Sequence, residues 1–211
     1  MTLPDDTTLT ETGLTANGTG SILLLACGAL AREVLALIRM NGWDHFDLHC
    51  LPASLHNHPD RIPNAVEEAV ARHRAKYDSV VVLYADCGTG GLLAAACDRL
   101  GIDMLPGPHC YSFFDGNAVF ADRGEVTAFY LTDFLTRQFD SCVYKPLGLD
   151  RHPDLRDAYF GNYETLVYLA QTDDAALTAR AQAAAARLGL AFERRFTGYG
   201  DLATALEALA P

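Results

Sequence analysis

Residues 79–85, SVVVLYA, form a continuous run of mainly β-branched and apolar side chains between turn-forming residues. A strand with one face in solvent alternates apolar and polar side chains. A continuous run is instead typical of a strand that is buried on both faces of a parallel sheet. This one segment therefore predicts an α/β fold, in which helices cover both faces of the sheet.

The rest of the chain alternates in the same way. Further strands are expected at residues 21–26, 46–51, 102–107, 164–170 and 190–196, and helices at residues 29–40, 64–77, 91–100, 126–139, 173–188 and 200–210. This order predicts a doubly wound, mainly parallel sheet in a Rossmann-like three-layer arrangement. Residues of about 110–160 depart from the alternation and predict a partly helical insertion.

Length and composition predict how the chain is divided. With 211 residues, half of them hydrophobic, the chain can bury one large core, so we expect a single α/β domain over residues 21–211. Residues 1–20 are rich in Thr, Gly and Asp, lack the basic start and apolar centre of a signal peptide, and predict a flexible arm. No apolar run reaches the roughly 20 residues of a membrane span.

Charge and cysteine content restrict the expected partners and compartment. A formal net charge of −11 argues against nucleic acid as a partner and suits a cytoplasmic protein. Six cysteines are too few for a disulfide scaffold in a chain of this length, and without a signal peptide we expect free thiols in a reducing compartment. No membrane association is expected.

Three cysteines follow three expected strands. Cys27 comes after ILLLA, Cys87 after VVVLYAD, and Cys110 just beyond MLPGPH. Since ligands bind at the carboxyl ends of parallel strands, the fold is expected to bring the three thiols to one edge, where they would hold a metal with one coordination position open. The alternative is that each is a small buried residue, which we expect for Cys50, Cys97 and Cys142.

Two histidines belong to the same expected edge. His109 immediately precedes Cys110, and His56 lies in the loop after the second expected strand. Imidazole can complete a metal site or transfer protons near neutral pH. We expect His56 as a possible fourth metal ligand, and His109 and Asp86 as candidate acid–base residues.

The glycines after Cys87 join a strand to a helix. Gly88, Gly90 and Gly91 match neither the GxGxxG spacing of dinucleotide-binding loops nor a Walker motif. Backbone amides in such a turn can bind an anion, and the alternative is a tight turn that brings the helix close to the sheet, with Asp86 as its cap.

Residues 147–163 are dense in charged and aromatic side chains. Arg151 and Arg156 in this segment could close over a bound anion, as in the rim of a small-molecule pocket. The other reading is that they form ion pairs that fix a loop.

Several segments together resemble one known family. LACGALAREVLAL, LPASLHNHPDRIP, YADCGTGG, GPHCYSFF, LTDFL and LGLDRHPDLRDAYFGNY with VYLAQT look like the domain of unknown function 1638 family (DUF1638), over roughly residues 22–206. The resemblance implies no agreed activity, and it implies an association with corrinoid-dependent methyltransferase systems. Carrying the motifs over draws attention to Cys27, His56, Cys87, His109 and Cys110.

These patterns predict a metal-binding protein that acts on or carries a small anionic molecule. Three lone cysteines from separate strand ends are similar in arrangement to those of quinolinate synthase, so a four-iron–four-sulfur cluster is expected ahead of zinc. The first alternative is a non-catalytic metal or cofactor carrier, or an accessory protein of a corrinoid methyltransferase system; the second is an enzyme with Cys87 as its nucleophile. The pattern does not determine whether the protein is an enzyme or whether it forms a homo-oligomer.

Overall fold

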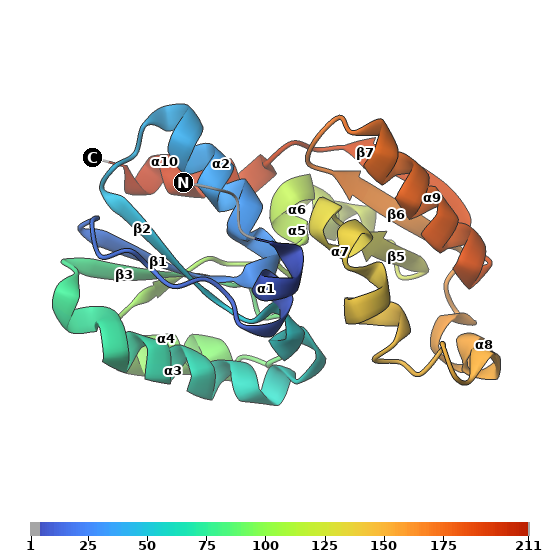
Figure 1. Ribbon diagram of the computed structural model, residues 1–211, viewed down its shortest axis with the longest axis horizontal. Coiled ribbons are helices and arrows are strands. Elements are labelled where there is room, and N and C mark those ends of the chain that lie inside the picture. Colours follow the sequence, from blue (N-terminus) through green and yellow to red (C-terminus); the bar gives the residue numbers. More distant parts are fainter. Residues whose placement is uncertain (1–4, 211) are drawn as a thin grey trace. The chain divides into compact units, whose positions relative to one another are not determined.

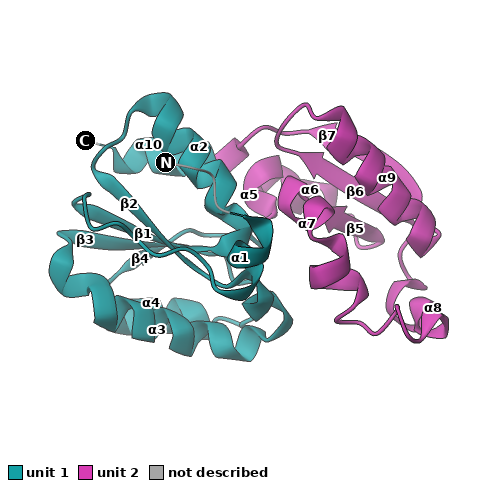
Figure 2. Ribbon diagram, viewed as in Figure 1, with its two compact units in different colours: residues 1–110, 202–211 teal, residues 111–201 magenta. Residues whose placement is uncertain are grey.

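The computed structural model describes residues 5–210 and divides the chain into two compact units (Figure 2). The first unit contains the chain up to Cys110 together with the segment from Leu202 onward, and the second is Tyr111–Asp201. One domain with one sheet was expected over residues 21–211. The chain has two sheets because a strand in the expected insertion pairs within the second half of the chain.

The first unit is a four-stranded parallel sheet in the order β2-β1-β3-β4. Its strands are β1 (Ile22–Cys27), β2 (Phe46–Leu51), β3 (Ser79–Leu83) and β4 (Asp103–Met104), and its longer helices are α2 (Ala31–Asn41), α3 (Ile62–His73) and α4 (Leu92–Leu100). Helices α3 and α4 lie on one face of the sheet and α2 on the other (Figure 1). Leu23, Leu24, Leu25 and Val82 are completely buried, as a strand covered on both faces requires.

Short helical turns connect these elements, and the last helix returns to this unit. The turns are η1 (Gly28–Leu30), η2 (Ala53–Asn57), η3 (Pro59–Arg61) and η4 (Arg74–Lys76). Helix α10 (Gly200–Leu209) contributes Leu202 and Leu206 to the buried core.

Part of the expected arm is ordered. Asp6–Glu11 form helix α1, capped by the side chain of Asp5, with Leu9 fully buried. Leu14 forms an antiparallel bridge with Cys50 of β2. A flexible arm was expected over residues 1–20, and the structure gives part of it a helix and a buried leucine, because isolated apolar side chains pack within a segment whose average composition is polar. Residues 1–4 lie outside the described part.

The second unit has its own parallel sheet, in the order β5-β6-β7. Its elements are α5 (Ser112–Asp115), α6 (Asn117–Arg123), β5 (Ala128–Leu131), α7 (Asp133–Arg137), η5 (Asp140–Tyr144), η6 (Pro153–Leu155), α8 (Arg156–Phe160), β6 (Thr165–Ala170), α9 (Ala175–Leu188) and β7 (Ala191–Phe196). The single helix expected over 126–139 is instead a strand followed by a short helix, which Thr132 caps by accepting a hydrogen bond from the Leu135 amide at 3.2 Å. Phe129 and Tyr130 lie in the strand that pairs with β6, and this tertiary pairing overrides the helical spacing.

The predicted fold class is confirmed. Both sheets are parallel and flanked by helices, as in Rossmann-like α/β proteins, and residues 111–160 are mainly helical as expected. Across residues 5–210, no helix combines the length and the apolar character needed to span a bilayer.

Candidate functional site

Two of the three predicted cysteines touch. The two segments that follow β3 and β4 remain hydrogen-bonded to each other. The amide of Asp86 donates to the carbonyl of Gly107 at 2.9 Å, and the amide of Cys87 donates to the carbonyl of Pro108 at 3.0 Å. This extension brings the Sγ atoms of Cys87 and Cys110 to 3.0 Å from each other. Both side chains are buried, with 5% and 4% of their surface exposed.

Cys87 adopts an uncommon backbone conformation. Its φ of +49° is positive, and Cys87 is the one non-glycine residue with this property in the described part of the chain. The left-handed region costs a side-chain-bearing residue about 1–3 kcal/mol and persists where the surroundings impose it. The turn therefore holds the Cys87 thiol in one direction at the expense of local strain.

Asp86 fixes the glycine turn. Its carboxylate accepts hydrogen bonds from the Gly91 amide at 2.6 Å, the Thr89 hydroxyl at 3.0 Å and the Gly90 amide at 3.2 Å. These bonds, the one from Gly91 first, hold the pKa of Asp86 below its usual value. The amides predicted to bind an anion already donate to Asp86, so an external anion would have to displace this carboxylate.

Cys27 lies close to the pair. It ends β1, and the register that places Ala26 opposite Leu83 puts Cys27 beside Tyr84, the residue after β3. Cys27 is buried, and its sulfur accepts a weak hydrogen bond from the Ala29 amide at 3.5 Å.

Tyr84 also lies at this edge, although the sequence pattern does not single it out. It is completely buried, and its hydroxyl has no hydrogen bond of ordinary geometry, with the Cys27 thiol as its neighbour. Burial, followed by the charges of Cys27, Cys110 and Cys50, raises the pKa of Tyr84 well above its usual value. The available signal was a phenol near the end of the run SVVVLYA, which is apolar apart from Ser79 and Tyr84.

The two touching thiols differ in acidity. The hydrogen bond from Cys110 lowers the pKa of Cys87, although burial opposes this effect. The same bond and then burial raise the pKa of Cys110 well above its usual value. These opposite directions make Cys87 the more acidic thiol of the pair, and its thiolate would accept a hydrogen bond from Cys110.

The predicted histidines lie near this edge. His109 is half-buried, and loss of solvent lowers its pKa while the charge of Asp86 opposes that change. His56 is exposed. Loss of solvent around its ring, and then the charge of His109, nevertheless lower its pKa. The two imidazoles are thus within electrostatic range of each other.

The side chains as they stand do not form a complete metal site. Within residues 5–210, no three His, Cys, Asp or Glu side chains are arranged to hold a metal ion. Cys87 and Cys110 are in contact, Cys27 is near enough for its charge to affect the pKa of Cys110, and His56 is within electrostatic range of His109.

The remaining three cysteines were expected to be small buried residues. Cys50 and Cys97 are buried, and Cys142 is partly buried. Burial, and then Asp98, raises the pKa of Cys97 to about 11.

Arg156 has a structural role in the second unit. Its guanidinium donates to the Leu188 carbonyl at 2.5 Å, the Gly189 carbonyl at 3.3 Å and Asp157 at 2.7 Å. It thereby satisfies the carboxyl end of α9, which otherwise leaves carbonyl groups unpaired. Arg151 is exposed and lies 3.8 Å from Asp150.

Residues 50–206 match the family model described as "Protein of unknown function (DUF1638)". This match covers most of the chain, so the chain belongs to this family. His56, Cys87, His109 and Cys110 lie within the matched residues, and Cys27 precedes them. No curated protein and no solved structure matches the chain.

Proposed function

We propose that the protein binds a thiophilic metal centre through Cys87 and Cys110, with Cys27 as the third ligand, and uses it to act on or carry a small anionic molecule. The observation that carries this proposal is the 3.0 Å distance between two buried sulfurs that arrive from different strand ends. Thiolates are the ligands preferred by zinc and by iron–sulfur clusters.

The distance is compatible with this role after a small adjustment. Zinc–sulfur bonds of about 2.3 Å in tetrahedral geometry separate two sulfurs by about 3.8 Å. A disulfide would require about 2.04 Å. From 3.0 Å, each arrangement is reached by a change of less than roughly 1 Å, so the pair is preorganised for chemistry that joins the two sulfurs.

The third ligand must move to complete the site. Cys27 is close enough for its charge to raise the pKa of Cys110, and it lies beside the Tyr84 hydroxyl. When a metal displaces the proton of Cys27, this hydroxyl would supply a hydrogen bond to the thiolate, as groups around a metal ligand commonly do. Three protein ligands would leave one position for the anionic molecule.

The test is metal analysis of untagged protein purified without air. Wild type is expected to contain zinc, or iron and sulfide with broad visible absorption, and Cys110→Ser is expected to lose most of it. Cys97→Ser is the matched control, because Cys97 is equally buried but lies in α4; it should keep the metal.

Two results would count against the proposal. One is metal-free wild-type protein that also fails to bind added zinc or a reconstituted cluster. The other is equal metal loss in Cys110→Ser and Cys97→Ser. Metal-free protein that forms a Cys87–Cys110 disulfide with a small disulfide oxidant would instead favour dithiol chemistry with Cys87 as the nucleophile.

A further inference from the structure

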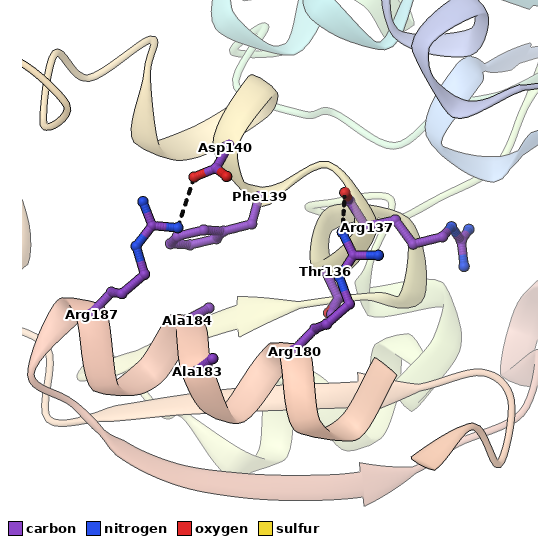
Figure 3. A pocket seen from close by; sticks show the side chains of 8 residues that line it. All are labelled: Thr136, Arg137, Phe139, Asp140, Arg180, Ala183, Ala184 and Arg187. Atoms are coloured by element: carbon purple, nitrogen blue, oxygen red, sulfur yellow. Dashed lines mark hydrogen bonds and ion pairs between the residues drawn. The ribbon is translucent and has the colours of Figure 1, made fainter. Parts of the chain in front are cut away.

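A hollow of about 180 Å³ lies in the second unit between α7 and α9 (Figure 3). Arg180, Ala183, Ala184 and Arg187 of α9 line one side of it. This spacing places them on one helix face, and the two small alanines leave open space between the two arginines. The opposite wall comes from α7 and the residues that follow it, including Thr136 and Asp140.

The hollow has an excess of positive charge. Arg187 pairs with Asp140 at 2.8 Å and stacks over Tyr144 at 4.0 Å, so its position is fixed. Arg180 donates to the Arg137 carbonyl at 2.9 Å and forms no ion pair with a carboxylate of residues 5–210. Figure 3 shows the Arg137 side chain directed away from the hollow while its carbonyl faces Arg180. The lining thus presents two inward guanidinium groups and one carboxylate.

Thr136 supplies an independent sign of a ligand. Its side chain is 2% exposed and lines the hollow, and its hydroxyl has no hydrogen-bond partner. A buried hydroxyl without a partner is unfavourable, and native structures rarely keep one without a reason. A hydroxyl that lines the same hollow as an unneutralised guanidinium is suited to an oxygen of a bound anion.

We infer that this hollow binds a small oxyanion, with Arg180 and Thr136 as its principal contacts and Arg187 as a further hydrogen-bond donor. Pockets for drug-sized ligands occupy about 300–1,000 Å³, so this one is suited to a phosphate or carboxylate group rather than to a nucleotide. Asp140 is paired with Arg187, so these two charges compensate each other and the excess positive charge of the hollow comes from Arg180. The inference does not depend on the thiol site, whose residues all belong to the first unit.

The experiment is calorimetric titration of the full-length protein with inorganic phosphate at constant ionic strength. Wild type should bind saturably, and Arg180→Gln should weaken binding about tenfold or more, because hydrogen bonds to charged groups contribute the equivalent of at least that factor. Thr136→Val, which keeps the shape, should weaken it several-fold. Arg151→Gln removes an exposed arginine elsewhere in the same unit and should leave it unchanged.

Further titrations with glycerol phosphate and succinate identify the source of the anion. Tighter binding of either than of phosphate would assign a phosphorylated or a carboxylate ligand, respectively. Absence of saturable binding for all three anions would overturn the inference. An equal loss of phosphate affinity in Arg180→Gln and Arg151→Gln would also overturn the inference. That result would mean that phosphate responds only to the overall charge of the protein.

Discussion

At the scale of single residues, function and stability compete at Cys87. Its positive φ aims the thiol at Cys110, and the hydrogen bonds of the extended β3–β4 pairing and of the Asp86 carboxylate hold the turn in place. Strain of this kind is an observation from which a functional role can be inferred.

The strain at Cys87 predicts that glycine and alanine substitutions there reverse their usual order of stability. In regular structure, glycine is less stable than alanine by about 0.5–1 kcal/mol. At position 87 the left-handed backbone reverses this order, so Cys87→Gly should be more stable than Cys87→Ala by about 1 kcal/mol. Urea unfolding midpoints of the two variants measure the difference.

The same pair of changes at Cys97 is the control. Cys97 lies inside α4, where Cys97→Ala should be more stable than Cys97→Gly by about 1 kcal/mol. If alanine were the more stable substitution at both positions, the assigned strain at Cys87 would be incorrect.

At the scale of elements, ion pairs connect segments that are distant in sequence. In the second unit, Arg195 of β7 donates from two nitrogens to the two carboxylate oxygens of Glu125, both at 2.7 Å. The Tyr130 hydroxyl of β5 donates to the same carboxylate at 2.6 Å. This two-point geometry links the two edge strands of the sheet without a direct strand pairing.

The pair predicts a pH-dependent contribution to stability. Arg195, as the main cause, lowers the pKa of Glu125 from 4.5 to about 2. A lowered folded-state pKa stabilises the protein above the unfolded value of about 4.5, and this contribution is lost as the pH falls towards 2. Glu125→Gln should therefore cost about 1–2 kcal/mol at pH 7, allowing for partial exposure, and almost nothing near pH 2.

Urea unfolding at several pH values between 7 and 2 measures this contribution. Glu164→Gln, at an exposed position next to β6, is the matched control and should change stability little at any pH. A cost for Glu125→Gln that stayed constant down to pH 2 would contradict the role given to the charge.

At the scale of the whole molecule, the two proposed sites belong to different units. Cys27, Cys87, Cys110 and Tyr84 are all in the first unit, and the hollow between α7 and α9 is in the second. Each unit has its own sheet and its own buried residues, so each ligand should stabilise mainly the sheet that holds it.

Hydrogen exchange with and without metal tests this separation, on the premise that the proposed metal site is correct. At a free metal concentration of about 100 times Kd, protection of slowly exchanging amides in β1 and β3 should increase by about 100-fold. Amides of β5 and β6 should change far less. Equal increases in both sheets would contradict a metal site confined to the first unit.

The sequence by itself determined the α/β class, the buried β1 and β3 strands and the position of Cys87 and Cys110 behind strand ends, since these follow from local periodicity and from the rules of parallel sheets. Only the tertiary structure decided that β5 pairs with β6 in a second sheet and that Leu9 is buried, because strand partners and burial depend on residues distant in the chain. It also decided that Asp86 occupies the amides of Gly90 and Gly91, and that Arg180 and Thr136 share a hollow. Such groupings depend on distances between side chains, and sequence spacing constrains those distances only within one helix or strand.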